Sequence, residues 1–323
     1  MSCVLVIGEA ANGHLVPASM EAAAAGAALA QSLHLPLAGG LIGDAPDNIA
    51  SEFGAGFATL YLAQLPQLGS STAHTQVAAA QILIKSANPS IILLPHTLRA
   101  REWAPALAAA LDTSLVMDCI ALRLEGELLV AQKPVHGGAV MGEFVLRGSP
   151  RVATLRSGAF ARAATAPNAR VERIDADIAM SEKVTILEDI VTQASSGPKL
   201  TDAKIVVAGG RGLGSPDNWH YIETAAAALG GAVGASRPVV DSGWVSSSHQ
   251  VGLSGNSINA DLYVAVGISG AVQHLAGING SAVVAAINTD GQADIFTRAN
   301  YGVTGDYKEI LPAFVERVKR LKG

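Results

Sequence analysis

Aromatic and charged residues are both scarce in this sequence. Only 4% of its 323 residues are aromatic and 15% are charged, whereas 50% are hydrophobic and 34 are glycine. Because large rings are few, the interior must be filled mainly by Ala, Val, Leu and Ile, which suits helices packed closely on a mostly parallel sheet. The chain is longer than one hydrophobic core usually serves, so we expect two domains.

Cysteines are too few, and basic residues too scattered, for several kinds of site. Cys3 and Cys119 are the two cysteines, and neither belongs to a Cys-x-x-Cys or Cys/His cluster. We therefore expect neither a metal site nor a disulfide framework. The 22 basic and 27 acidic residues give a net charge of −5, and the basic ones form no stripe. Nucleic acid is therefore not an expected partner.

The sequence also lacks an apolar run typical of a membrane span or a leader. Residues 4–7 are strand-like and are followed by Glu9, unlike a signal or transit peptide. The uncharged stretch 22–43 is mainly alanine, contains polar side chains and is broken by Pro36. We expect a cytoplasmic protein without membrane insertion.

Strand and helix patterns alternate along the first part of the chain, which predicts βαβ units and a parallel sheet. The expected strands are 4–7, 37–42, 58–62 and 90–94, and the expected helices are 17–33, 75–87 and 101–111. Three alternating runs then follow over short connections, which is typical of an antiparallel excursion: residues 120–124, 128–133 and 139–146, with a loop at His136-Gly-Gly138.

The small, polar residues 193–202, which include a Gly-Pro pair, predict a linker between domains 1–192 and 203–323. The alternation then restarts, with strands expected at 205–208, 232–235, 262–267 and 282–287 and helices at 216–229, 271–276 and 306–321. The predicted fold is α/β: an N-terminal Rossmann-like domain with an antiparallel excursion and a C-terminal doubly wound domain on a parallel sheet.

Polar residues follow each expected strand of the second domain. Arg211, Ser236 with Arg237, the turn 269–274, and Asn288 come after successive strands. Since ligands bind beyond the carboxyl ends of such strands, we expect these residues at one edge. Glycines, free amides and a guanidinium there suit a pyrophosphate.

Each turn also has a structural interpretation. Residues 209–215 match neither the full Gly-x-Gly-x-x-Gly spacing nor a Walker motif, and their glycines could serve packing alone. Arg237 could pair with Asp241, and His274 taken alone could be a structural histidine.

Taken together, the motifs resemble the electron-transfer flavoprotein alpha subunit. They are Gly-Gly-Arg211-Gly-Leu, Gly-Ala-Ser236-Arg237, Gln250-Val-Gly252, Gly267-Ile-Ser-Gly-Ala-Val-Gln-His274-Leu-Ala-Gly277, Ala286-Ile-Asn288, and in the first domain Leu94-Pro-His96-Thr97 and Arg101-Glu-Trp-Ala-Pro105-Ala-Leu-Ala-Ala109. The resemblance implies non-covalent FAD in the second domain and a heterodimer with a beta subunit, which docks on the first domain. It further implies an electron carrier, with no catalytic residues, between flavin dehydrogenases such as acyl-CoA dehydrogenases and a quinone oxidoreductase or other acceptor.

The resemblance also implies which residues contact FAD: Arg211, Ser236, Arg237, Gln250, Val251, Gly252, Leu253, Ser254, Ser269, Gly270, Ala271, Val272, Gln273, His274, Asn288, Asp306 and Tyr307. Arg237 would lie against the isoalloxazine ring and favour negatively charged flavin, and His274 would sit near the flavin C2 carbonyl. Ser254 stands where the family usually has a threonine near flavin N5, so its rotamer should be less fixed. Leu253 and Asn256 are further departures, at positions where a polar residue and a lysine are common.

Two other functions remain open from the sequence. An enzyme could use His96, Arg101 and the 136–138 loop of the first domain as an adenine-nucleotide or acyl-transfer site, because these residues also follow expected strands. Alternatively, the chain could be a structural adaptor that binds FAD without transferring electrons.

Overall fold

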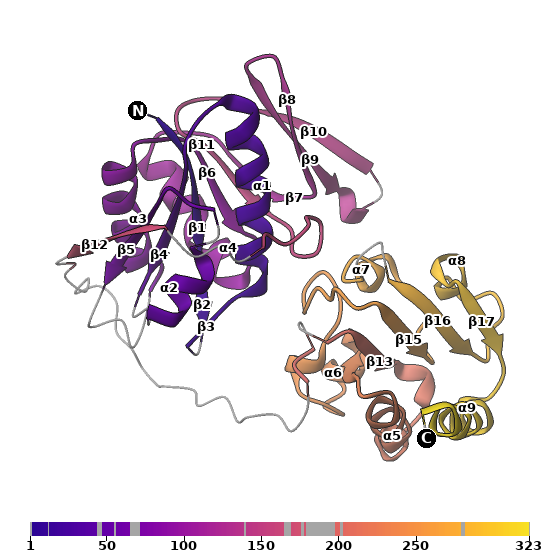
Figure 1. The fold of residues 1–323 in the computed structure, drawn as a ribbon. Helices are drawn as coiled ribbons and strands as arrows, with labels where there is room; N and C mark the ends of the chain where they lie inside the picture. The colour runs from indigo at the N-terminus through magenta and orange to yellow at the C-terminus, as the bar shows by residue number, and fades with distance from the viewer. Residues whose placement is uncertain are drawn as a thin grey trace. The chain divides into compact units, whose positions relative to one another are not determined.

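The computed structural model describes residues 2–11, 13–43, 47–54, 56–64, 72–138, 140–164, 169–175, 178, 198–200, 203–278 and 282–322. The chain divides into two compact units, Met1–Ile190 and Val191–Gly323 (Figure 1). Most of the predicted linker 193–202 lies outside the described residues. No helix in the described part is long and apolar enough to cross a membrane.

The first unit is built on a seven-stranded parallel sheet, in the order β12-β5-β4-β1-β6-β11-β7. Its strands are β1 (Cys3–Gly8), β4 (Leu37–Ile42), β5 (Thr59–Gln64), β6 (Pro89–Pro95), β7 (Leu115–Cys119), β11 (Arg151–Leu155) and β12 (Arg170–Asp175). The central strand β1 is buried along its whole length, as expected for a parallel sheet covered on both faces. The predicted parallel sheet is confirmed, although the short strands β7, β11 and β12 were not predicted.

Four helices accompany this sheet: α1 (Pro17–Leu33), α2 (Asp47–Phe53), α3 (Ala73–Ala87) and α4 (Leu98–Ala110). Helix α1 begins with proline in its first turn, where no amide hydrogen bond is lost, and ends at His34 in the left-handed conformation. In helix α3, Thr72 and Thr75 exchange side-chain to backbone hydrogen bonds in a capping box. Local signals therefore mark both ends of α1 and the start of α3.

The predicted antiparallel excursion is confirmed as a separate three-stranded sheet. Strands β8 (Ala121–Glu125), β9 (Leu128–Val135) and β10 (Val140–Leu146) pair in the order β10-β9-β8 (Figure 1). The turn His136–Gly138 connects β9 to β10. A further short pair, β2 (Ala10–Ala11) with β3 (His14–Leu15), follows β1.

The second unit carries a five-stranded parallel sheet in the order β14-β13-β15-β16-β17. Its strands are β13 (Ile205–Gly209), β14 (Ala232–Ala235), β15 (Leu262–Val266), β16 (Val283–Asn288) and β17 (Tyr301–Thr304). Because β14 lies on one side of β13 and β15 on the other, the strand order reverses between β13 and β15. Open α/β sheets bind ligands beyond such a reversal point.

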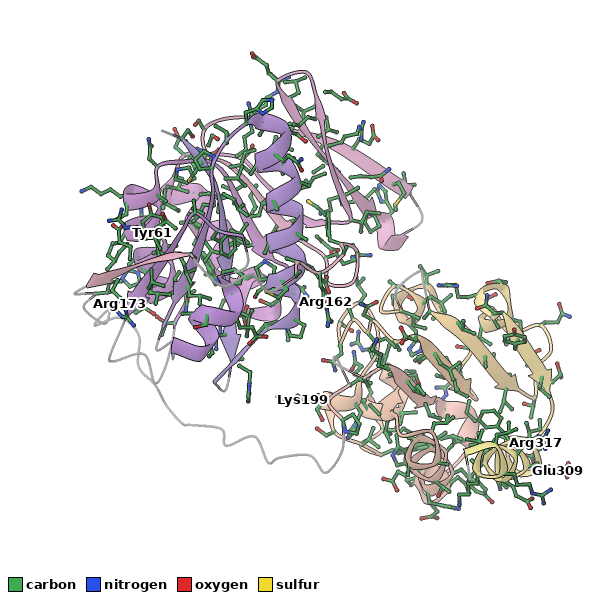
Figure 2. All side chains as sticks on the ribbon, viewed as in Figure 1. Tyr61, Arg162, Arg173, Lys199, Glu309 and Arg317 are labelled. Atoms are coloured by element: carbon green, nitrogen blue, oxygen red, sulfur yellow. The ribbon has the colours of Figure 1, made fainter. Side chains whose placement is uncertain are left out.

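Side chains alternate along these strands into two cores. Val207, Val264 and Val266 pack beneath helices α5 (His220–Leu229) and α9 (Tyr307–Lys322), whereas Val206 and Tyr263 face the opposite core. Helix α9 buries Leu311 and Val315, one turn apart, and turns charged side chains such as Glu309 and Arg317 outward, as Figure 2 shows. Asp306 accepts a hydrogen bond from the Lys308 amide at 2.9 Å, as expected of a residue that caps this helix.

Short helices follow the remaining strands: α6 (Arg237–Asp241), α7 (Val272–Leu275) and α8 (Ile295–Arg298). The helix predicted at 216–229 is instead a 3-10 turn, Pro216–Trp219, followed by α5. Proline at the start and the Ser215 side chain, which accepts from the Asp217 amide, explain the tight first turn.

Candidate functional site

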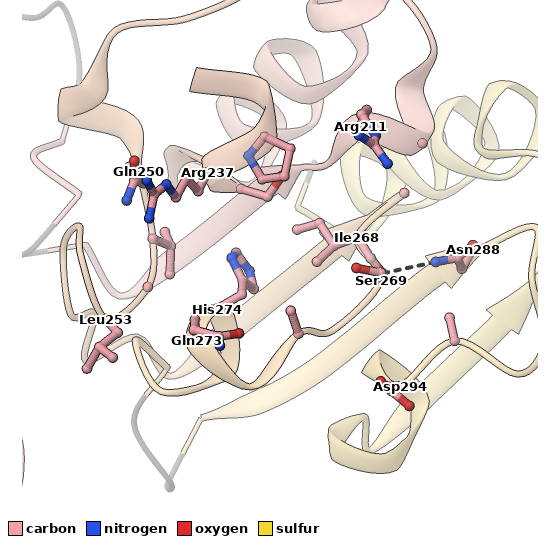
Figure 3. A pocket seen from close by; sticks show the side chains of 18 of the residues that line it. Arg211, Arg237, Gln250, Leu253, Ile268, Ser269, Gln273, His274, Asn288 and Asp294 are labelled. Atoms are coloured by element: carbon pink, nitrogen blue, oxygen red, sulfur yellow. Dashed lines mark hydrogen bonds between the residues drawn. The ribbon is translucent and has the colours of Figure 1, made fainter. Parts of the chain in front are cut away.

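One cavity in the second unit has a volume of about 880 Å³, within the range of ligand pockets. It lies beyond the carboxyl ends of β13, β14, β15 and β16, at the reversal point of the sheet (Figure 3). Its lining residues are Arg211, Gly212, Ser236, Arg237, Pro238, Gln250, Val251, Gly252, Leu253, Ser254, Gly267, Ile268, Ser269, Ala271, Gln273, His274, Asn288, Asp290, Gln292, Ala293 and Asp294.

Glycines at the ends of β13 and β15 let two backbones touch at the floor of this cavity. The Gly210 amide donates to the Val266 carbonyl at 2.8 Å, and the Gly212 amide donates to the Gly267 carbonyl at 3.0 Å. A Cβ at Gly210 would overlap the Gly267 carbonyl, and Gly267 itself has a φ of 62°. The packing role considered for these glycines is therefore real, and it is what places Arg211 beside the cavity.

The loop 250–256 is fixed on the sheet by backbone hydrogen bonds. The Val251 amide donates to the Ala235 carbonyl at 2.9 Å, and the Leu253 amide donates to the Gln273 carbonyl at 2.7 Å. Asn256, where a lysine is common in the family that the sequence resembles, donates its amide hydrogens to the carbonyls of Ser248 and Gln250. Asn256 therefore braces the loop.

Ser254 has a hydrogen-bond partner within its own loop. The Gln250 side-chain amide donates to Ser254 Oγ at 3.0 Å, and Gln250 is 8% exposed. Because Oγ accepts this hydrogen bond, its own proton stays available for an acceptor in the cavity. The Gln250 amide is therefore one constraint on the orientation of this hydroxyl.

The cavity carries both signs of charge. Arg211 and Arg237 are the cationic side chains of its lining, and Asp290 and Asp294 are the acidic ones. Arg237 is exposed, with 66% of its side-chain surface accessible, and its Nε lies 3.3 Å from Asp241. The pairing with Asp241 that the sequence left open is present, but an exposed pair of this kind is weak and leaves the guanidinium free to meet an anion.

Asn288 connects two loops of the cavity wall. Its side-chain amide donates to the Ile268 carbonyl at 2.9 Å, and its side-chain oxygen accepts from the Asp290 amide at 3.0 Å (Figure 3). It therefore joins the loop after β15 to the loop after β16.

His274 is the buried ionisable group of the cavity. It is 7% exposed, and its Nε2 lies 2.7 Å from the Tyr263 hydroxyl. Burial lowers the pKa of His274 to about 4, and the Val251 carbonyl opposes this shift only in part. The imidazole is therefore neutral at pH 7, and its Nδ1 has no hydrogen-bond partner of ordinary geometry among the described residues.

The structure brings most of the predicted site residues together. Thirteen of them line the cavity: Arg211, Ser236, Arg237, Gln250, Val251, Gly252, Leu253, Ser254, Ser269, Ala271, Gln273, His274 and Asn288. Gly270 and Val272 belong to the same turn but are not in the lining, and Gly270 packs against the backbone of Ile295. Asp306 and Tyr307 are not in the lining either, because Asp306 caps α9 and the Tyr307 hydroxyl donates to the Leu213 carbonyl at 2.9 Å.

Eight lining residues were not predicted: Gly212, Pro238, Gly267, Ile268, Asp290, Gln292, Ala293 and Asp294. Four of them directly adjoin predicted positions or strand ends. The remaining four, Asp290, Gln292, Ala293 and Asp294, lie on the loop after Asn288, and following each strand end for six residues would have found them.

In the first unit, His96 belongs to a polar cluster at the ends of β6, β7 and β11. Its Nδ1 lies 2.8 Å from Thr154 Oγ1, and its Nε2 lies 3.9 Å from Asp118. Arg156 donates two hydrogen bonds to Asp118, at 2.8 and 2.6 Å. A nearby cavity, lined in part by Glu9 and Arg99, has a volume of about 10 Å³, far too small for a nucleotide. These contacts favour a structural role for His96.

The pair of Asp118 and Arg156 gives a prediction about stability and pH. Burial by itself would raise the pKa of Asp118, but the hydrogen bonds and charge of Arg156 outweigh it, so the pKa is lowered. The pair therefore stabilises the fold above the pKa of the unfolded chain, and this stability is lost as the pH falls through the folded pKa. We expect Asp118→Asn to destabilise the first unit by about 2 kcal/mol at pH 7 and by much less near pH 3.

Calorimetry of the thermal transition at both pH values measures this difference. Glu143→Gln is the matched control, because it removes a bidentate arginine pair, with Arg123, that is exposed to solvent. An equal loss of stability in Asp118→Asn and Glu143→Gln, or a loss of stability that does not depend on pH, would contradict the role given to Asp118.

Two family models match the chain. Residues 4–179 match the electron transfer flavoprotein domain, and residues 199–279 match the electron transfer flavoprotein FAD-binding domain. The second range contains the strand ends and turns that form most of the cavity.

Curated proteins from several bacteria are similar to the chain over nearly its whole length. The electron transfer flavoprotein subunit alpha of Thermoanaerobacterium thermosaccharolyticum is 36% identical, over 99% of this chain and 98% of that protein. The subunit of the same name from Bacillus subtilis is 35% identical, over 98% of both. Protein FixB of Rhizobium meliloti is 36% identical, over 97% of this chain and 92% of that protein. Among solved structures, a benzoylformate decarboxylase from Polynucleobacter necessarius matches at 11% identity over 98% of this chain and 58% of that chain, with a TM-score of 0.22, too low to bear on the fold.

Proposed function

Because the chain belongs to the electron transfer flavoprotein alpha-subunit family, whose second domain binds FAD, we propose that it forms a heterodimer with a beta subunit. In this heterodimer it relays electrons from flavin dehydrogenases, such as acyl-CoA dehydrogenases, to a quinone oxidoreductase or another acceptor. It acts as a carrier and converts no substrate of its own. We place this relay in the cytoplasm and the domain boundary at residues 193–202.

The observation that carries this proposal is the cavity of about 880 Å³ at the reversal point of the second sheet. FAD, when bound, supplies the ring that accepts and releases electrons. The residues of the cavity suit it: Arg211 and Ser269 for phosphate charge, Asp290 and Asp294 as acceptors for hydroxyl groups.

The other end of the cavity suits the redox-active ring. Ser254 keeps a hydroxyl proton to donate, and Arg237 offers a positive charge that favours electron uptake. His274 adds a neutral ring whose Nδ1 has no hydrogen-bond partner of ordinary geometry among the described residues. We propose that the remaining predicted contacts, Gly270, Val272, Asp306 and Tyr307, act by shaping the turns behind the cavity.

The docking surface proposed for the beta subunit is the edge of the small antiparallel sheet in the first unit. Strand β10 pairs with β9 on one side only. It exposes Val140, Met141, Phe144 and Val145, each with 40% or more of its surface accessible. An unpaired strand edge that carries apolar side chains is a surface that proteins usually cover with a partner.

The visible absorption spectrum of the chain purified with its beta subunit tests this function. We expect a yellow heterodimer that releases FAD on denaturation and is bleached by a dehydrogenase with its substrate. Charged substitutions in β10, such as Val140→Asp with Val145→Asp, should abolish copurification of the two subunits. A colourless pair that cannot be reconstituted with FAD would refute the proposal, whereas FAD that no dehydrogenase reduces would favour a structural adaptor.

A further inference from the structure

A buried tyrosine lies directly behind His274. Tyr263, on β15, has no exposed surface, and its hydroxyl oxygen lies 2.7 Å from Nε2 of His274, on α7. Tyr263 itself does not line the cavity, whereas His274 does, beside Gln273 (Figure 3). The contact therefore joins the hydrophobic core of the second unit to the wall of the candidate flavin site.

The hydrogen bond can be made in two ways, and counting protons distinguishes them. If the tyrosine hydroxyl donates to Nε2, both of these atoms are satisfied and the imidazole proton is on Nδ1. If Nε2 donates instead, the hydroxyl proton of Tyr263 has no acceptor among the described residues, and Nδ1 is an unpaired lone pair as well. The first arrangement leaves one buried polar atom without a hydrogen bond and the second leaves two, so the first is favoured.

Two features of the surroundings agree with this choice. Burial raises the pKa of Tyr263, so the phenol keeps its proton and remains a donor. The Val251 backbone raises the pKa of His274 and so favours a proton on the ring, although it does not meet the geometry of an ordinary hydrogen bond to Nδ1. The ring is then neutral, with a proton on the nitrogen that lacks a partner of ordinary geometry among the described residues.

A buried polar atom without a partner in a cavity wall needs an explanation, since nearly all such atoms in proteins are paired. Among the described side chains that are not exposed, His274 Nδ1 is the buried polar atom that lacks a hydrogen-bond partner. Only 7% of the surface of His274 is exposed, so the residue is 93% buried. An acceptor atom of a ligand would give Nδ1 the hydrogen-bond partner that it lacks.

We propose that Tyr263 is a positioning residue: its hydroxyl donates to Nε2 of His274 and keeps the imidazole proton on Nδ1, which donates a hydrogen bond to an acceptor atom of the bound flavin. The identity of that ligand rests on the function proposed above, whereas the tautomer does not. In this arrangement, His274 acts on the flavin as a neutral donor whose direction is set from the core.

Nitrogen NMR of the histidine rings tests the tautomer directly, in the heterodimer with and without FAD. The eight histidines are labelled with ¹⁵N, and the ring of His274 is assigned by the signals lost in His274→Asn. At pH 7 we expect Nδ1 to be protonated and Nε2 to be unprotonated. In Tyr263→Phe, which removes only the hydroxyl, the proton should move in part to Nε2. A wild-type ring protonated on Nε2 would overturn the proposal, even if no FAD binds.

The flavin midpoint potential tests whether the tautomer matters to the cofactor. We expect Tyr263→Phe to weaken the preference for reduced over oxidised flavin about tenfold, which is about 59 mV for a one-electron couple. The double variant Tyr263→Phe with His274→Asn separates positioning from general damage. If Tyr263 acts through His274, its substitution should leave the potential of the His274→Asn protein unchanged.

Each further outcome has a distinct meaning. If Tyr263→Phe shifts the flavin midpoint potential as much in the His274→Asn protein as in the unaltered one, the tyrosine acts by some other route. That result would overturn the positioning role. An unchanged potential in the single variant would do the same. If the heterodimer binds no FAD, the proposed function fails, but the ¹⁵N signals of the FAD-free protein still decide the tautomer. Circular dichroism and the melting temperature establish that each variant is folded.

Discussion

Replacing Gly210 with alanine should lower the stability of the second unit by about 3 kcal/mol and abolish FAD binding. The added Cβ would overlap the backbone carbonyl of Gly267 on the neighbouring loop. Backbone cannot move aside as a flexible side chain can, so the ends of β13 and β15 must separate. Two hydrogen bonds that join them, from the Gly210 and Gly212 amides, would be strained at once.

Thermal unfolding of the heterodimer and FAD titration measure these two effects. Gly291→Ala is the matched control, because Gly291 also lies on a loop at this edge but a Cβ there would meet only Thr304, at 3.4 Å or more. The control should bind FAD and melt like the unaltered protein. Normal FAD affinity in Gly210→Ala would show that the backbone contact between the two loops does not shape the cavity.

Replacing Arg237 with alanine should leave FAD bound and lower its midpoint potential by about 40 mV for a one-electron couple. A positive charge near the flavin favours the reduced, negatively charged ring, so its removal makes electron uptake harder. The effect is moderate because 66% of the arginine side chain is exposed to solvent, which screens its charge. Reduction by a dehydrogenase should slow in parallel.

Spectroelectrochemical titration of the heterodimer measures this shift, and two variants serve as controls. Arg237→Lys keeps the charge and should keep most of the potential. Asp241→Asn removes the carboxylate 3.3 Å from the guanidinium without altering the cavity lining, so the potential should stay the same or rise slightly. An unchanged potential in Arg237→Ala would count against a redox role for this residue and favour a role in binding alone.

The retention of FAD expected in Arg237→Ala would also separate the two arginines of the cavity. Arg211 follows β13 at the glycine contact, whereas Arg237 begins α6 after β14. We propose that Arg211 serves FAD affinity and that Arg237 serves the flavin potential.

Alternation of apolar runs and helical periodicity was enough to predict both parallel sheets and most of their elements. Helix α1, strand β4 and strand β14 have the predicted bounds, because proline, left-handed residues and short buried runs mark them locally. Strands β7, β11, β12 and β17 were missed. β12 and β17 are mostly exposed, β7 is partly exposed along most of its length, and β11 is only five residues long and includes an arginine and a threonine, so none shows the continuous apolar run of a buried strand.

The sequence by itself determined which residues could serve a ligand, because polar and glycine residues follow each strand of a parallel sheet, and parallel strands end at one edge. Only the tertiary structure decided how those residues are used. It gave Gly210 and Gly212 to backbone packing, Gln250 to Ser254, Tyr307 to the Leu213 carbonyl, and Tyr263 to His274. Some of these partners are far apart along the chain, such as Tyr307 and Leu213, and others, such as Gln250 and Ser254, meet only because of how a loop folds. Hydrogen bonds form between neighbours in space, which periodicity does not encode.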